Sequence, residues 1–211
     1  MKIYDLTLTL SPELVVWEGD APVEIERTSQ MEKGDEYNLS ALKMSVHAGT
    51  HVDAPRHFLP EGKGVDQLNP DDLSGPASVV DVRGYARINR GILDGLSLPE
   101  SVRRLILLTD NTGRNILYSA SFIRDFVALD ETAADWLVER GIRLVGIDSL
   151  SVAPYGFSFQ THTTLLKADV IIVEGLDLHG IKTGSYELVV MPLKIRDCDA
   201  APARVMLKAG L

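Results

Sequence analysis

The chain has 211 residues, of which 45% are hydrophobic and 24% are charged, and its formal net charge is −9. This length and composition suit one globular domain over residues 1–211 and exclude a disordered chain. The acidic balance, without a run of lysine or arginine, argues against nucleic acid and anionic membranes as partners. No apolar stretch approaches the roughly 20 residues that cross a bilayer. The first residues lack the apolar core of a secretion signal, so we expect a cytoplasmic protein.

The predicted elements are mostly strands. Alternating or apolar β-rich segments predict strands at residues 2–10, 23–29, 38–46, 77–82, 104–109, 143–148, 168–174, 186–195 and 203–208. Helices are expected at 119–126, 131–140 and 163–167, and Gly141 gives the second of these a C-terminal cap. Residues 83–100 are rich in glycine and are expected to be irregular. This pattern indicates a mixed α+β fold.

The segment from His47 to His57 holds three of the five histidines of the chain and one aspartate. Histidine and aspartate are the usual protein ligands of catalytic zinc and manganese, which indicates a metal site formed by His47, His51 and Asp53. The first two histidines are four residues apart, the spacing of one helix face, but Gly49 between them argues against a helix. We expect these ligands to project from a strand end and a tight loop.

His57 has three interpretations: a fourth ligand, a general acid or base, or a structural histidine. We favour acid–base catalysis, because a catalytic metal site keeps an open coordination position. Trp17, in the loop before Gly19, is either a buried core residue or a stacking platform for an aromatic substrate.

A second pair of candidate ligands, His162 and Glu174, lies far downstream. Glu174 directly follows the apolar run Val170-Ile-Ile-Val, and a carboxylate at the end of a buried strand is typical of a site at the edge of a sheet. The alternative is an ordinary exposed glutamate. If this pair meets the first cluster, Asp53 can bridge two metal ions.

Two further residues show no functional pattern. His179 has no motif around it and is interpreted as a structural or surface histidine. Cys198 is the single cysteine, so it forms no disulfide within the chain, and we interpret it as a small structural residue.

The segment His47-Ala-Gly-Thr-His-Val-Asp-Ala-Pro-Arg-His-Phe58 resembles the H-x-G-T/A-H-x-D-x-P-x-H signature of the metal-dependent cyclase-like hydrolases. This family includes the bacterial kynurenine formamidases and the isatin hydrolases. The resemblance extends along most of the chain. Trp17-Glu-Gly-Asp20 is similar to the W-x-G-D loop of the family, Gly146-Ile-Asp-Ser-Leu-Ser151 to its G-I-D-x-x-S strand, Thr161-His162 and Val173-Glu174 to its second metal half, and Ala201-Pro-Ala-Arg204 to its A-P-x-R ending.

The resemblance implies a swivelling β/β/α domain that forms dimers or tetramers. It makes His47, His51 and Asp53 the ligands of one metal ion, and Asp53, His162 and Glu174 the ligands of a second. His57 would donate and accept the proton, and Trp17 would contact the substrate. The implied cofactor is zinc, with one or two ions in each subunit, or manganese, which the isatin hydrolases use.

The activity that this resemblance implies is hydrolysis of a small-molecule substrate, N-formylkynurenine, to kynurenine and formate. The alternatives are an isatin-hydrolase-like or other cyclic amide or lactone hydrolase, and a non-catalytic metal-binding scaffold. The sequence departs from the formamidases at two places. Glu18 stands where they commonly have proline, and residues 109–115 match them weakly.

Overall fold

The computed structural model describes residues 2–210. Its main strands are β1 (Lys2–Asp5), β4 (His51–Asp53), β5 (Ser74–Asp81), β6 (Arg104–Leu108), β7 (Leu144–Ile147), β8 (Ile171–Glu174), β9 (Gly184–Pro192) and β10 (Ala200–Ala209). They form one sheet in the order β1-β10-β4-β8-β7-β6-β5-β9. Because β9 also pairs with β10, seven of these strands close into a barrel, and β1 is added beside β10.

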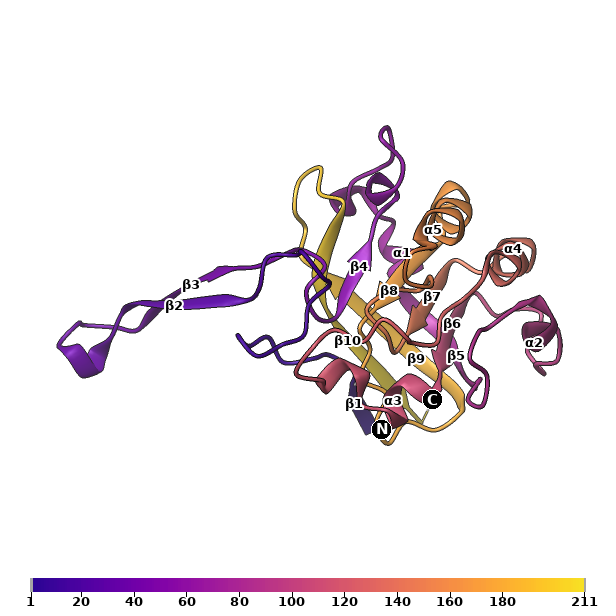
Figure 1. Cartoon of the computed structure of the whole chain (residues 1–211), viewed down its shortest axis with the longest axis horizontal. Coiled ribbons are helices and arrows are strands. Elements are labelled where there is room, and N and C mark those ends of the chain that lie inside the picture. Colours follow the sequence, from indigo (N-terminus) through magenta and orange to yellow (C-terminus); the bar gives the residue numbers. More distant parts are fainter. Residues whose placement is uncertain (1, 211) are drawn as a thin grey trace.

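The middle of the sheet is parallel, from β5 through β6 and β7 to β8, and the other pairings are antiparallel. The helices are α1 (Pro70–Leu73), α2 (Arg90–Asp94), α3 (Asp110–Gly113), α4 (Glu131–Glu139) and α5 (Ser158–Lys167), with short 3-10 turns at Met31–Lys33, Pro55–His57, Val65–Gln67 and Ile116–Tyr118. Figure 1 shows α2, α4 and α5 together on one side of the sheet. Within residues 2–210, no helix is long and apolar enough to cross a membrane.

The parallel strands are apolar on both faces because both faces are covered. Leu105 and Leu107 of β6 pack with buried residues of α4 and α5, including Leu137 and Leu165. The alternate residues of β6, such as Ile106, face the barrel interior, where they join apolar side chains from the other barrel strands. This double burial explains why the continuous apolar runs in the sequence predict these strands well.

A β-hairpin, the arm, projects from the barrel. It consists of β2 (Glu24–Ser29) and β3 (Leu39–Lys43), which form a separate two-stranded antiparallel sheet. Figure 1 shows the arm projecting away from the barrel, on the side opposite α2 and α4. Nearly every residue of the two strands is exposed, including the apolar Ile25, Leu39 and Leu42.

The mixed α+β architecture predicted from the sequence is confirmed, and some predictions of local structure are wrong. The strand predicted at residues 2–10 ends at Asp5. Residues 119–126 contain no helix; the backbone N–H and C=O of Val127, just after this segment, pair with the amide side chain of Asn111 and not with helical partners. Residues 83–100 are not wholly irregular, since they contain α2, capped by the Asn89 side chain. Helix α5 begins at Ser158 and is therefore longer than the turns predicted at 163–167.

Gly175 fixes how closely the end of β8 approaches the loop before β4. Its φ is +68°, and a Cβ atom built on it would lie only 2.3 Å from the carbonyl oxygen of Gly49. The Thr50 hydroxyl donates a hydrogen bond of 2.6 Å to the Gly175 carbonyl oxygen. This contact joins the chain just before His51 to the chain just after Glu174, so it sets the distance between two candidate ligands.

Gly175→Ala is expected to destabilise the fold more than Gly141→Ala. Both glycines have positive φ, which costs an L-residue about 1–2 kcal/mol, but a Cβ at Gly141 meets nothing within 4 Å. The difference between the two variants therefore isolates the close approach to Gly49. Urea unfolding of both variants measures it, and equal losses of stability would contradict this role of Gly175.

Candidate metal centre

Strand register brings the candidate ligands together. His51 and Asp53 are two residues apart on β4, so their side chains point to the same face of the strand. In the antiparallel pairing of β4 with β8, His51 lies directly opposite Glu174. His47 comes from the turn that precedes β4, and His162 comes from the buried face of α5. Segments that are far apart in the sequence thus meet at one end of β4 and β8.

The donor atoms form two overlapping groups that share Asp53. In the first group, Asp53 Oδ1 lies 3.1 Å from His47 Nδ1 and 3.4 Å from His51 Nε2. In the second, His162 Nε2 lies 3.4 Å from Glu174 Oε1 and 3.7 Å from Asp53 Oδ2. Glu174 Oε2 is also 3.3 Å from His51 Nε2. The structure therefore brings all five sequence-predicted ligands into one cluster.

The hydrogen bonds of the cluster fit a divalent cation. Within residues 2–210, His51 Nε2 and both carboxylate oxygens of Asp53 are buried without a hydrogen-bond partner. Unpartnered buried polar atoms are costly, so this arrangement needs a ligand to satisfy it. His51 Nδ1 and His162 Nδ1 are bonded to the carbonyl oxygens of Gly49 and Ser158, which leaves each Nε2 free to coordinate.

The charges of the cluster balance one another. Burial opposes a charge on His51, but the adjacent carboxylates of Asp53 and Glu174 outweigh it and raise its pKa to about 10. Burial likewise opposes a charge on His162, and Glu174 raises its pKa above the ordinary value. In turn, His47 and His51 hold the pKa of Asp53 well below its usual range, although burial acts the other way. A divalent cation can replace the protons that these imidazoles carry without it.

His57 differs from the other histidines of the site. It ends the 3-10 turn Pro55–His57, and its side chain is 29% exposed, against 1% for His51. Burial lowers the pKa of His57, and the neighbouring charges of His47 and His162 lower it further against the pull of Asp53. The imidazole is therefore neutral at physiological pH and able to accept a proton.

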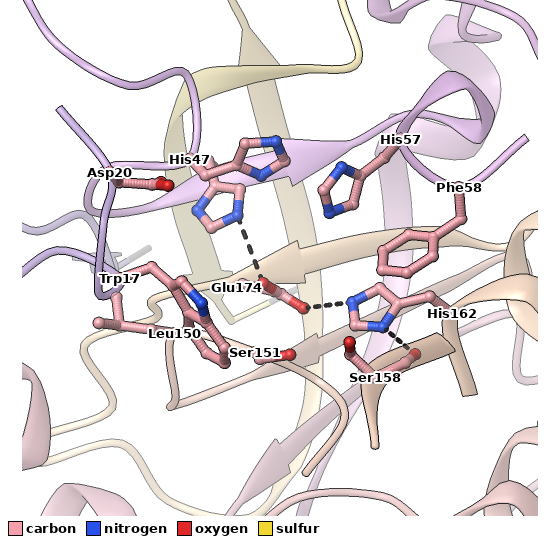
Figure 2. A pocket seen from close by; sticks show the side chains of 11 residues that line it. Trp17, Asp20, His47, His57, Phe58, Leu150, Ser151, Ser158, His162 and Glu174 are labelled. Atoms are coloured by element: carbon pink, nitrogen blue, oxygen red, sulfur yellow. Dashed lines mark hydrogen bonds and ion pairs between the residues drawn. The ribbon is translucent and has the colours of Figure 1, made fainter. Parts of the chain in front are cut away.

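A cavity of about 190 Å³ opens beside the cluster. Figure 2 shows Trp17 and Leu150 on one side of it and Phe58 and His162 on the other. Phe58 stacks on the His162 ring, with 4.4 Å between the centroids. Polar groups, among them Asp20, Ser151 and Ser158, complete the lining. The cavity is thus small, has aromatic walls and ends at the metal centre.

Trp17 lines this cavity and also packs against the protein. Its ring centroid lies 4.7 Å from that of Phe122 and 5.5 Å from that of Tyr155. Trp17 therefore packs against the protein and lines the cavity as well, so its packing does not exclude the stacking interpretation. Its role toward a substrate stays a prediction.

Glu18, the departure from the formamidases, does not line the cavity. Its carboxylate accepts hydrogen bonds of 2.7 and 3.0 Å from Arg124 and one of 2.8 Å from the Tyr155 hydroxyl. The Arg124 guanidinium lies over the Tyr155 ring, 4.8 Å from its centroid. These contacts tie the Trp17 loop to the segments that carry Arg124 and Tyr155. None of the three residues lines the cavity, so the departure leaves the cavity lining intact.

Sequence reasoning missed two residues beside the centre. Asp199 Oδ2 accepts a hydrogen bond of 2.8 Å from His47 Nε2, and Phe58 stacks on His162. Asp199 directly precedes β10, and Ala200 lies opposite Asp53 in the β10–β4 ladder. Only this pairing, which is not visible in the sequence, brings Asp199 to the site.

Glu174, His179 and Cys198 lie in three different environments. Glu174 is buried, so its interpretation as an ordinary exposed glutamate is wrong. His179 is half exposed, and its ring is bonded to Asp177 outside the cluster. Cys198 is partly buried and free.

Comparisons with known proteins agree with the signature. The family model described as "Putative cyclase" matches residues 4–154. Cyclase-like protein 1 of Arabidopsis thaliana is 37% identical over 98% of this chain and 84% of its own length. The kynurenine formamidase of Erythrobacter litoralis (strain HTCC2594) is 34% identical over 98% of this chain and 94% of its own length.

A solved structure agrees as well. The predicted metal-dependent hydrolase from Bacillus stearothermophilus superposes with a TM-score of 0.83 at 32% identity, covering 98% of this chain and 97% of that one. The family model, the relatives and the solved structure thus point to the same family. The chain belongs to the putative cyclase family, the cyclase-like metal-dependent hydrolases that its histidine signature predicted.

Proposed function

We propose that the protein is an arylformamidase, which hydrolyses N-formylkynurenine to kynurenine and formate. The observation that carries this proposal is the imidazole of His57 beside a cluster of metal-ligand side chains with unpartnered donor atoms, at the end of a small cavity with aromatic walls. The similarity to the kynurenine formamidase of Erythrobacter litoralis along nearly the whole of both chains supports the same substrate.

The metal cofactor proposed here is zinc, in one or two ions per subunit, and manganese is the alternative. His47, His51 and Asp53 would hold one ion, and Asp53, His162 and Glu174 the other. Nitrogen and carboxylate donors suit both metals. When bound, such an ion polarises the substrate carbonyl and lowers the pKa of a water molecule.

The chain's own residues then perform the proton transfers. Figure 2 shows one ring nitrogen of His57 directed into the cavity, toward Glu174 and His162. The neutral imidazole takes the proton from the water that attacks the formyl carbon. It returns that proton to the amide nitrogen as the C–N bond breaks, so that formate and the free amine leave. The indole of Trp17 would stack on the aryl ring of the substrate and hold the amide against the ligand cluster.

The two alternative functions differ in what they require of the site. A non-catalytic metal scaffold would need a closed coordination sphere, whereas this cluster opens onto a cavity beside His57. A cyclic amide or lactone hydrolase would use the same ligands and the same base. Hydrolysis assays with zinc-loaded protein on N-formylkynurenine, isatin and simple lactones separate these cases. Preference for isatin or a lactone would overturn the arylformamidase assignment.

His57→Ala is expected to keep its metal and to lose turnover by about 10²–10⁴-fold, the usual contribution of general acid–base catalysis. Elemental analysis and kcat on N-formylkynurenine measure the two effects separately. His179→Ala, which removes a histidine outside the cluster, is the matched control and should change neither quantity. Wild-type turnover in His57→Ala would remove His57 from the mechanism.

Zinc is expected to bind more tightly as pH rises, because protons and the ion compete for the same imidazole nitrogens. The pKa of His51 is raised to about 10, so this group is protonated at neutral pH in the metal-free protein and must lose its proton on binding. Titration calorimetry with zinc, in buffers of different ionisation enthalpy, should detect at least one proton released between about pH 6 and 9. Binding without proton release would contradict the assignment of His51 as a ligand.

We also propose that the protein forms a homo-oligomer through the hairpin arm, packed against a second copy of the chain. An isolated two-stranded hairpin is marginally stable at best in water, so the arm needs a surface to cover it. Ile25 and Leu42 lie directly opposite each other and thus share one face of the arm, while Glu26 and Ala41 share the other face. This exposed apolar pair supports contact with protein.

Leu42→Glu is therefore expected to shift the molecular mass measured by light scattering from a multiple of the chain mass toward the single chain. Ala41→Glu adds the same charge to the opposite face of the arm and serves as the control. A wild-type protein that is already monomeric would contradict the proposal, as would equal effects of the two substitutions.

A further inference from the structure

Asp199 lies beside the metal centre but belongs to neither proposed set of ligands. Its Oδ2 atom is 2.8 Å from His47 Nε2 and 3.8 Å from His57 Nδ1. The two imidazole rings are 4.2 Å apart between centroids. One carboxylate oxygen thus lies between a candidate ligand and the candidate base.

The backbone holds Asp199 in this place. Its carbonyl oxygen accepts a hydrogen bond of 2.8 Å from the Ala54 N–H, and the next residue, Ala200, pairs with Asp53 in the β10–β4 ladder. The backbone of Asp199 and of the residue after it is therefore tied to β4 and to Ala54, which follows β4. Although its side chain is 42% exposed, Asp199 has the fixed backbone that a positioning residue needs.

The first function of this contact concerns the tautomer of His47. The Nδ1 atom of His47 faces Asp53 Oδ1 at 3.1 Å, so coordination there requires the ring proton to be on Nε2. Asp199 accepts the hydrogen bond of that Nε2–H group. His51 and His162 have the opposite tautomer, with the proton on Nδ1, because backbone carbonyl oxygens accept a hydrogen bond from that atom. Asp199 thus gives His47 the hydrogen-bond acceptor that backbone carbonyl oxygens give His51 and His162.

The second function concerns His57. A carboxylate on the Nδ1 side of an imidazole favours the tautomer with its proton on Nδ1, and this leaves Nε2 unprotonated as the base. The distance of 3.8 Å is longer than a hydrogen bond in this structure. Catalytic hydrogen bonds are often long before substrate binds and shorten in the complex.

We propose that Asp199 is a positioning residue that sets the tautomers of both His47 and His57, and so couples metal binding to proton transfer. The part that concerns His57 rests on the proposed hydrolase function, whereas the part that concerns His47 rests on the metal centre alone. The same three residues have donor atoms close enough together to hold an ion themselves, with Asp199 as a ligand. That arrangement is the competing outcome of the test.

The test compares Asp199→Ala with Asp199→Asn. Zinc affinity of the metal-free protein is measured by competition with a chelator, and kcat and KM on N-formylkynurenine are measured at saturating zinc. Asp199→Ala should weaken zinc binding by about 10–100-fold, the usual effect of losing a carboxylate that orients a ligand histidine. It should also lower kcat with KM unchanged. Asp199→Asn should restore most of the zinc affinity, because its amide oxygen can accept from His47 Nε2–H.

Asp177→Ala is the matched control, since Asp177 bonds to the ring of His179 at 2.7 Å outside the site. Its zinc affinity and kcat should equal those of the wild type. Unchanged zinc affinity in Asp199→Ala would overturn the role toward His47, and unchanged kcat the role toward His57. Fewer bound ions at saturation in both Asp199 variants would make Asp199 a ligand and overturn positioning. Since the zinc titration needs no substrate, a protein inactive on every amide would refute the proposed function and leave the result for His47 standing.

Discussion

The burial of Asp53 is the constraint on which the rest of the site depends. Its side chain is fully buried, and within the described residues neither carboxylate oxygen has a hydrogen-bond partner. A buried carboxylate without compensation is strongly unfavourable, so positive charge must lie against it. His47, His51 and His162 supply that charge when protonated, and a divalent cation supplies it when they are neutral. The imidazoles thus surround this carboxylate at a place where positive charge compensates its burial.

Closure of the barrel is what keeps the carboxylate buried. Strand β4 has only three residues, yet it lies between β8 and β10 and pairs with both. One of these neighbours carries Glu174, and the other begins just after Asp199. A shift of one residue in either pairing would turn His51 and Asp53 to the opposite face of the sheet. The register of a structural strand therefore also determines the geometry of the metal centre.

The sequence predicts those parts of the site whose signal is local. His47, His51, Asp53 and His57 lie within one short segment, and their types and spacing indicate a metal site without any knowledge of the fold. The core strands are equally predictable, because burial on both faces leaves continuous apolar runs. In the sequence, Glu174 stands out only as an odd carboxylate at the end of a strand. Its meeting with the first cluster depends on the pairing of β4 with β8.

Two misses have different physical causes. The start of α5 is not predictable from the sequence, because Phe157 occupies the N-cap and makes no side-chain hydrogen bond there. The usual polar signal of a helix start is therefore absent. His162 was therefore not assigned to a helix, although α5 orients it. Asp199 was hidden because its contact with His47 spans most of the chain and depends on the β10–β4 ladder. Propensity does not encode a contact of that kind.

Each histidine of the site has one ring nitrogen that faces away from the ligand cluster. The hydrogen-bond partner of this nitrogen distinguishes the ligands from the base. His51 and His162 bond at Nδ1 to nearby backbone carbonyl oxygens, at Gly49 and Ser158, so each orientation is fixed locally. His47 depends on a side chain from the far end of the chain. Among residues 2–210, the nearest such partner of His57 is a carboxylate oxygen of Asp199 at 3.8 Å, and of the four histidines His57 is the one with a lowered pKa. Firm anchoring suits a ligand, whereas a loosely held neutral ring is free to take up a proton and release it. The division between ligands and base thus follows from their hydrogen-bond partners.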